Sequence, residues 1–185
     1  EQQACSVLTG SAATKAFNIK AETDKTRERY GRNRWGQQLL LARRLVEAGV
    51  DLVTAQFSGT LCGGVGNWDD HPVNANCFEA IKYRLQFMDK AVAALIEDIY
   101  DRGLDRRVLV VVTGEFGRTP RISYKASTGK RIGSAPAGTV QPGRDHWPRA
   151  PALRFSGGGR QTGPVIGGTD MRGEAPGARI GGRGG

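Results

Sequence analysis

The feature that most constrains the fold is an unbroken apolar run at residues 108–112, within the segment RRVLVVVTGEFGRTP. A strand that is apolar at every position is typical of a parallel sheet covered on both faces. The run follows a predicted helix over residues 76–102, in which apolar residues recur at helical spacing and which Gly103 ends. The sequence therefore predicts that this strand lies inside a sheet flanked by helices.

An earlier helix and strand extend the same pattern. Residues 27–48 show helical spacing and end at Gly49, and the β-branched residues 50–57 follow as a predicted strand. This order predicts an α/β fold with an open, mostly parallel sheet flanked by helices. Ligands of such folds bind beyond the carboxyl ends of the strands. The loops SGTLCGGVGNWDDH and TGEFGRTP would then lie at one edge of the sheet.

The chain has two histidines, and each lies in a similar loop, NWDDHP or GRDHWP. In an extended segment the side chains of Asp69 and His71 point the same way, because side chains repeat every two residues. Glu115 lies in the loop that leaves the predicted buried strand, and Asp145 precedes His146. Carboxylate and imidazole groups are ligands for divalent metals such as zinc and manganese. An Asp-His pair taken alone is more often a surface turn, and an acid placed like Glu115 is more often found at a helix start.

Two arginines next to these groups are candidates for binding an anion. Arg118 follows Glu115, and Arg144 precedes Asp145. A guanidinium group forms paired hydrogen bonds with the oxygens of an anionic group. Together, the residues predict a metal site with a binding position for an anionic substrate.

The net charge of +9 lies entirely after residue 117. Residues 1–117 hold 15 basic and 15 acidic residues, whereas residues 118–185 hold 12 basic and 3 acidic ones. The basic half has only Tyr124, Trp147 and Phe155 as aromatics and is broken by Gly and Pro, which disfavours nucleic acid as a partner. Polyanion binding stays open as a weaker alternative, and the sequence does not predict an oligomeric state.

The remaining segments predict how the chain is divided into a domain and a tail. Residues 1–170 are predicted to form one partial domain that contains further strands near 150–159 and 163–170, and residues 171–185 a disordered tail. Residues 121–145 show no helical or strand period. The sequence contains no run of 18 apolar residues, so it predicts no membrane span. The first residues do not resemble a signal peptide.

The three cysteines, Cys5, Cys62 and Cys77, form no CxxC motif, so the sequence gives no support for a zinc finger or a thioredoxin-like site. We expect free thiols. A bridge between Cys62 and Cys77 is the alternative if the protein is exported.

Five motifs taken in order resemble the DUF1501 family, planctomycete-type, which is assigned to the alkaline phosphatase/sulfatase-like superfamily. They are RERYGRNRWGQQLLLARRLVEAGV, NWDDH, VLVVVTGEFGRTPRI, GRDHWP and GGTDMRGE, and the resemblance spans roughly residues 8–175. It implies a phosphatase-like α/β sheet with metal ligands at the strand ends. Asp69 and His71 then resemble the first ligand pair, Glu115 an acidic ligand, and His146 the distant histidine.

This resemblance implies a role for each further group. Asp145 is a ligand or orients His146, and the cofactor is a divalent metal, with zinc expected and manganese or calcium as alternatives. The metal would activate a nucleophile or water against a phosphate or sulfate ester of a small molecule or a polysaccharide. The resemblance also implies a periplasmic or exported location.

The chain departs from the family pattern at three places. Asp70 stands where the family usually has Thr, the N-terminal region with the superfamily's nucleophile is not in this sequence, and the usual helical ending is replaced by PGARIGGRGG. We therefore expect a C-terminal fragment or truncated member that is inactive by itself. The leading function is a metal-dependent hydrolase, and the alternative is a non-catalytic, metal-stabilised binding or surface protein of the same fold.

Overall fold

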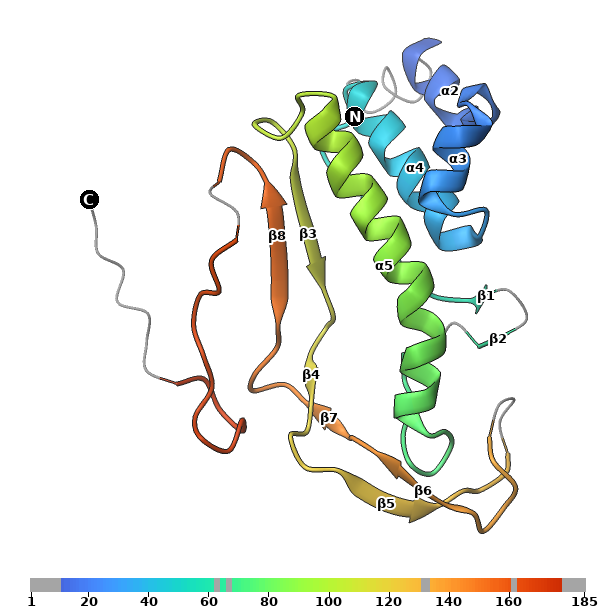
Figure 1. Ribbon diagram of the computed structural model, residues 1–185, viewed down its shortest axis with the longest axis vertical. Coiled ribbons are helices and arrows are strands. Elements are labelled where there is room, and N and C mark those ends of the chain that lie inside the picture. The colour runs from blue at the N-terminus through green and yellow to red at the C-terminus, as the bar shows by residue number, and fades with distance from the viewer. Residues whose placement is uncertain (1–10, 62–63, 66–67, 131–133, 161–162, 178–185) are drawn as a thin grey trace, which may run out of the picture. The chain divides into compact units, whose positions relative to one another are not determined.

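The computed structural model describes residues 11–61, 64–65, 68–130, 134–160 and 163–177 (Figure 1). The chain divides into two compact units: residues 1–68 with 82–108, and residues 69–81 with 109–185. The described residues contain both helices and strands, as predicted for an α/β chain. The predicted boundary at residue 170 stays a prediction.

The first unit is mainly helical. Its elements are α2 (Ser11–Phe17), the 3-10 helix η1 (Ile19–Ala21), α3 (Asp24–Tyr30), α4 (Arg34–Glu47), the hairpin of β1 (Thr60–Leu61) and β2 (Gly64–Val65), and most of α5 (Cys77–Asp101). The predicted helix at 76–102 is confirmed as α5. The helix predicted at 27–48 is two helices, because the Asn33 side chain accepts hydrogen bonds from the backbone of Trp35 and Gly36 and starts α4 anew.

Aromatic side chains form the centre of this unit. Tyr30 and Trp35 are fully buried. The Trp35 ring stacks on Trp68 with centroids 5.6 Å apart and lies 5.2 Å from Phe57. Burying such large rings is the main stabilising contribution of a small core.

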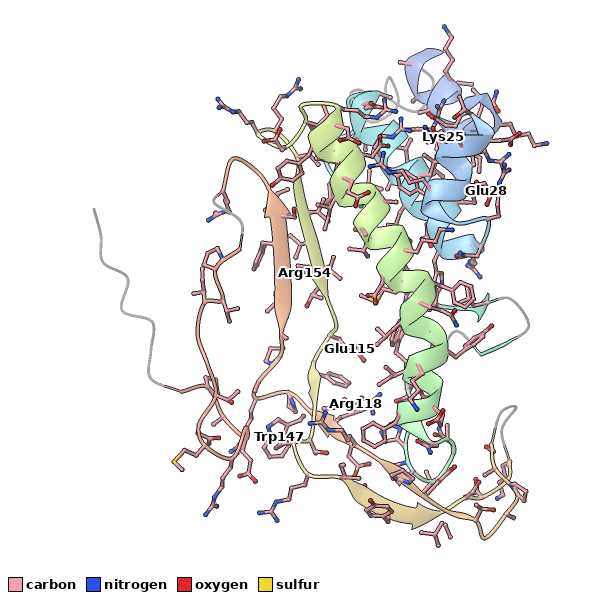
Figure 2. All side chains as sticks on the ribbon, viewed as in Figure 1. Lys25, Glu28, Glu115, Arg118, Trp147 and Arg154 are labelled. Atoms are coloured by element: carbon pink, nitrogen blue, oxygen red, sulfur yellow. The ribbon has the colours of Figure 1, made fainter. Side chains whose placement is uncertain are left out.

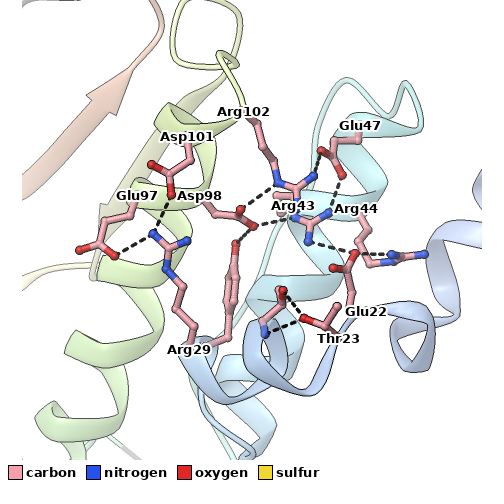
Figure 3. A network of polar contacts seen from close by, with 12 residues as sticks. Glu22, Thr23, Arg29, Arg43, Arg44, Glu47, Glu97, Asp98, Asp101 and Arg102 are labelled. Carbon is pink, nitrogen blue, oxygen red and sulfur yellow. Dashed lines mark hydrogen bonds and ion pairs between the residues drawn. The ribbon is translucent and has the colours of Figure 1, made fainter.

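A buried ionic network joins the helices of the first unit (Figure 3). The guanidinium of Arg43 on α4 is 2% exposed and lies 2.5 Å from Glu47, 2.9 Å from Asp98 on α5 and 3.0 Å from Glu22. The Tyr30 hydroxyl donates to Asp98 at 2.8 Å. Burial by itself lowers the pKa of Arg43, but the surrounding carboxylates raise it above the usual value. Arg43 therefore stays charged inside the unit.

The prediction of a strand at residues 50–57 is wrong, since no strand forms there. A strand needs a neighbouring backbone, and the carbonyl groups at the end of this segment bond to side chains instead. The Trp68 indole donates to the carbonyl of Phe57 at 2.7 Å, and the Trp35 indole donates to that of Ser58 at 3.2 Å. The segment contributes Phe57 to the aromatic core without joining a sheet.

In its described residues, the second unit contains the start of α5 and three antiparallel strand pairs. The strands are β3 (Leu109–Thr113), β4 (Gly117–Arg118), β5 (Ser123–Ala126), β6 (Val140–Gly143), β7 (His146–Trp147) and β8 (Leu153–Gly157). They pair as β3 with β8, β4 with β7, and β5 with β6. The described residues therefore form two-stranded antiparallel sheets and show no open parallel sheet.

The apolar run at residues 108–112 does form a strand, β3, and the strand predicted near 150–159 is its partner β8. Val111 pairs directly with Phe155, and both side chains are about half exposed, at 46% and 54%. Leu109 and Leu153 lie on the same face and are also exposed. One face of this pair is therefore apolar and open, whereas the sequence predicted burial on both.

The sequence does not reveal β5 and β6, because residues 121–145 have no alternating pattern. Their strands pair in register from Ser123 with Gly143 to Ala126 with Val140. Near the C-terminus the strand predicted at 163–170 contains only a bridge between Thr169 and Pro176. In the predicted tail, residues 171–177 form a turn, and residues 178–185 lie outside the described residues.

Two further predictions concern the cysteines and membrane spans. Cys77 is a buried free thiol, and Cys5 and Cys62 lie outside the described residues. No helix in the described part of the chain has the length and apolar character needed to cross a membrane.

Candidate metal centre

The first loop of the site, residues 69–76, is closed by Asn74. The Asn74 side chain accepts from the backbone N–H of His71 at 2.7 Å and donates to the carbonyl of Asp69 at 3.3 Å. The backbone N–H groups of Asn74 and Ala75 both donate to the His71 carbonyl, at 2.9 and 2.8 Å. These bonds fix the backbone on either side of Asp69 and His71.

The second loop is held by the short strand pair β4 and β7, which places Arg118 opposite His146. Thr119 continues the pairing: its backbone N–H donates to the Asp145 carbonyl at 2.9 Å, and its hydroxyl accepts from the Asp145 N–H at 3.1 Å. His146 therefore sits at a fixed register against the segment that follows β3.

The two loops contact each other through Pro72. Its carbonyl accepts from the buried Gln141 side chain at 3.0 Å. Its ring lies directly over Gly143, where an added Cβ would be 2.4 Å from Pro72 Cδ. The backbone N–H of Thr128 donates to the carbonyl of Val73, the residue after Pro72, at 3.0 Å. The first loop is thus seated on β6 by contacts that leave no room for a side chain at position 143.

This seating brings the two predicted histidines together with one aspartate. Nε2 of His146 lies 2.9 Å from Oδ1 of Asp69, and Nδ1 of His71 lies 3.5 Å from the same oxygen. The imidazole centroids are 4.6 Å apart. One ligand atom from each of the three residues lies within 4.8 Å of the others. The arrangement is that of a candidate metal site.

The carboxyl group of Asp69 is held in its charged form. Its partial burial acts to raise the pKa, but the hydrogen bond from His146 and the positive potential of His71, His146 and Arg118 leave the pKa lowered overall. The Asp69 side chain is 49% exposed and that of His146 is 43% exposed. Solvent therefore reaches a carboxylate that is ionised at neutral pH, which is the state that binds a metal.

Two residues of the motif GEFGR flank the histidines. The Phe116 ring packs against His146 with centroids 4.4 Å apart. Nη1 of Arg118 donates to the carbonyls of Asp70 and Arg144, at 3.0 and 3.1 Å, and lies 3.4 Å from Nε2 of His71. Sequence reasoning did not select Phe116. Its spacing of two from Arg118 was the available signal, because such residues share one side of an extended segment.

The other predicted site residues lie apart from the three ligand atoms. Glu115, which is labelled in Figure 2, is exposed in the loop between β3 and β4. It does not belong to the group of residues that converges. The Asp145 carboxylate faces Ser123 Oγ at 3.5 Å and Lys125 Nζ at 3.8 Å. Arg144 donates through Nε to the Thr119 carbonyl. The described geometry thus brings together three of the five predicted metal ligands.

The motifs that form this site are those on which the sequence resemblance was based. No curated protein and no solved structure is significantly similar to the chain. A family model described as "Protein of unknown function (DUF1501)" matches residues 1–179. Because the match covers almost the whole sequence, the chain belongs to the DUF1501 family.

Proposed function

We propose that Asp69, His71 and His146 bind a divalent metal ion and that the protein is a metal-dependent hydrolase of phosphate or sulfate esters. The single observation that carries the proposal is the convergence of the three ligand atoms within 4.8 Å. The residues come from two loops that are far apart in the sequence. Close approach of three potential ligands from such loops requires the tertiary contacts made by Pro72 and by β4 with β7.

The donor set fits zinc. Zinc ligands lie about 2.0–2.2 Å from the metal, so neighbouring ligand atoms of a tetrahedral site are separated by roughly 3.4 Å. The separations from Asp69 Oδ1, 2.9 and 3.5 Å, are close to that spacing. Two imidazole nitrogens and one carboxylate oxygen also suit manganese, whereas calcium prefers a site built from oxygen ligands. Zinc is therefore the expected ion.

Three ligands converge among the described residues, and this number favours a catalytic site over a structural one. Structural zinc sites are closed by four protein ligands, whereas catalytic sites keep a position for water or substrate. The bound metal would supply a Lewis acid and lower the pKa of a water molecule. Asp69 and His146 are both exposed by more than two fifths, so an ester can approach them from solvent.

The ester class rests on the resemblance of these motifs to the alkaline phosphatase/sulfatase-like superfamily. The same resemblance supports a phosphatase-like sheet, a planctomycete-type family and an exported protein. The predicted substrate is a small-molecule or polysaccharide ester with an anionic group. The net charge of +9 favours such substrates by electrostatic attraction.

The first test measures zinc and manganese binding to the 185-residue chain by equilibrium dialysis and metal analysis. We expect the variants to lose the binding of zinc and manganese that the wild type shows at the same metal concentration. The variants are Asp69→Ala, His71→Ala and His146→Ala. Asp89→Ala removes an exposed carboxylate on α5 and is the matched control. Equal metal content in the wild type and the three variants would overturn the metal site.

The second test measures turnover of a panel of aryl phosphates and aryl sulfates with the metal-loaded full-length protein. Activity that is lost in Asp69→Ala and His146→Ala supports the hydrolase. Metal that raises the melting temperature while no ester is hydrolysed would contradict it and favour the alternative, a non-catalytic, metal-stabilised binding protein. Glu115→Ala and Asp145→Asn, assayed in parallel, decide whether these two predicted ligands contribute.

A further inference from the structure

We propose that Arg118 is a positioning residue of the metal centre, which holds the two histidine loops together, and is not a substrate-binding cation. The inference deepens the proposed function and rests on it for the identity of the site. Its basis is that one nitrogen of the guanidinium, Nη1, reaches both loops. It donates to the carbonyl of Asp70 at 3.0 Å and to that of Arg144 at 3.1 Å.

Each of these carbonyls is close in the chain to a histidine. Asp70 directly precedes His71, and Arg144 lies two residues before His146. The backbone of Arg118 pairs with His146 across β4 and β7, while its side chain reaches the first loop. Arg118 therefore joins His146 through the strand pair and His71 through the guanidinium. Loss of the guanidinium would leave the backbone pairing of His146 and the contacts of Pro72 in place, but it would remove the hydrogen bond that holds the backbone next to His71.

The guanidinium also lies against one imidazole. Nη1 of Arg118 lies 3.4 Å from Nε2 of His71. Because its hydrogens are donated to the carbonyls of Asp70 and Arg144, this contact restricts the orientation of the His71 ring and leaves Nδ1 facing Asp69. That nitrogen lies 3.5 Å from Oδ1 of Asp69 and 3.3 Å from the Asp69 carbonyl. Arg118 thus turns the Nδ1 side of His71 toward Asp69, where the ligand atoms converge.

The alternative role, binding of an anionic substrate, uses the same positive charge but predicts a different result. Arg118 is partly buried, and its Nη1 is directed at two protein carbonyls. A cation close to a metal ion repels it, so removing a purely electrostatic Arg118 should tighten metal binding. Removing a positioning residue should weaken it, and changes around metal ligands typically cost about 10- to 100-fold in affinity. The two roles therefore differ in sign.

The test compares Arg118→Gln and Arg118→Lys with Arg121→Gln, measured on the full chain with Zn²⁺ alone. Arg118→Lys keeps the charge but loses the planar, forked donor geometry. Arg121 lies three residues further along the chain, and its side chain is 82% exposed. Arg121→Gln therefore removes the same charge as Arg118→Gln without touching the loops. We expect zinc affinity to fall about 10- to 100-fold in both Arg118 variants and to be unchanged in Arg121→Gln. Affinity that is unchanged or tighter in Arg118→Gln would overturn the proposal.

A second readout does not depend on metal. The chain has two histidines, so their ring resonances are simple to assign by NMR. In the metal-free wild type we expect a nuclear Overhauser contact between the rings, whose centroids are 4.6 Å apart. This contact should be lost in Arg118→Gln and kept in Arg121→Gln, while circular dichroism shows that each variant is folded.

The two readouts separate the two hypotheses. If the wild type binds no zinc but the ring contact depends on Arg118, the proposed metal function fails and the positioning role stands. If zinc binds and the ring contact survives in Arg118→Gln, the positioning role is wrong and the metal site stands.

Discussion

His146 and Asp69 are 77 positions apart in the chain, yet Nε2 of the histidine lies 2.9 Å from Oδ1 of the aspartate. The contact links two loops that are each stabilised by their own hydrogen bonds. Asn74 closes the first loop, and Thr119 extends the strand pairing of the second. A metal ion that binds at this point would crosslink the two loops, which gives the site consequences for stability as well as for chemistry.

Zinc should therefore raise the stability of the folded chain. A ligand that binds only the folded state at 100 times its Kd adds about 2.7 kcal/mol to the free energy of unfolding. We expect a higher Tm with zinc in the wild type and no shift in His146→Ala, as measured by thermal denaturation. Magnesium is the control ion, because it prefers oxygen ligands and keeps its waters. An identical zinc shift in wild type and His146→Ala would contradict the assignment of His146.

Gly117→Ala should disturb the site through the backbone. A Cβ at this position would lie 2.7 Å from the Ala150 carbonyl oxygen and 3.2 Å from that of Trp147. Since both contacts are to backbone, relief requires β4 to separate from β7, which carries His146. We expect the free energy of unfolding to fall by about 1–3 kcal/mol and zinc affinity to fall with it.

Gly114→Ala is the matched control for this change. Gly114 lies in the same TGEFGR segment, but its nearest contact is the Phe116 carbonyl oxygen at 3.4 Å, an ordinary separation. Chemical denaturation and zinc titration should show a lower free energy of unfolding and a lower zinc affinity in Gly117→Ala than in Gly114→Ala. Equal effects would show that the close approach at Gly117 does not position the site.

Gly143→Ala probes the other contact between the loops. The added Cβ would meet Pro72 at 2.4 Å from Cδ and 2.6 Å from the backbone nitrogen. The first loop must then move off β6, so we expect lower stability, by about 1–3 kcal/mol, and weaker zinc binding. Gly168→Ala has no atom within 4 Å of the new carbon and should change stability by less than about 0.5 kcal/mol. Comparable losses in both variants would argue against this packing.

Asp98→Asn should destabilise the helical unit. The Asp98 carboxylate is 7% exposed, pairs with Arg43 at 2.9 Å and with Arg102 at 2.8 Å, and accepts from Tyr30 (Figure 3). Removing one partner of a buried ion pair typically costs about 3–5 kcal/mol. Asp101→Asn on the same helix breaks an exposed pair with Arg29 and should cost less than about 1 kcal/mol. Urea denaturation of both variants checks the difference, and similar losses would contradict a buried network.

The same residue predicts a dependence on pH. Burial acts to raise the pKa of Asp98, but hydrogen bonds from Arg102 and Tyr30 and the charge of Arg43 leave it lowered. A lowered folded-state pKa gives stability that is present above the unfolded value, about 4, and is lost as the pH falls through the folded value. The stability difference between wild type and Asp98→Asn should therefore be largest near neutral pH and shrink below about pH 4. A difference that grows on acidification would refute this sign.

Local patterns were sufficient for part of the fold. The spacing of apolar residues predicted α5, and the apolar run predicted β3, because a helix face or a strand is defined by neighbours in the sequence. The same logic failed at residues 50–57, where a strand needs a partner and the indoles of Trp35 and Trp68 occupy the carbonyls instead. It also missed β5 and β6, whose pairing is not encoded in an alternating pattern.

For the site, the sequence by itself determined the residue types and the family. Two Asp-His loops identified Asp69, His71 and His146 as candidates, and the family model confirms DUF1501. Only the tertiary structure decided which candidates converge, because that depends on Pro72 seated over Gly143 and on the register of Arg118 with His146. The tertiary structure also shows which residues of the motif GEFGR belong to the site. Phe116 and Arg118 contact the histidines, whereas Glu115 lies exposed. Contacts between residues distant in the chain set these positions, and no local pattern records them.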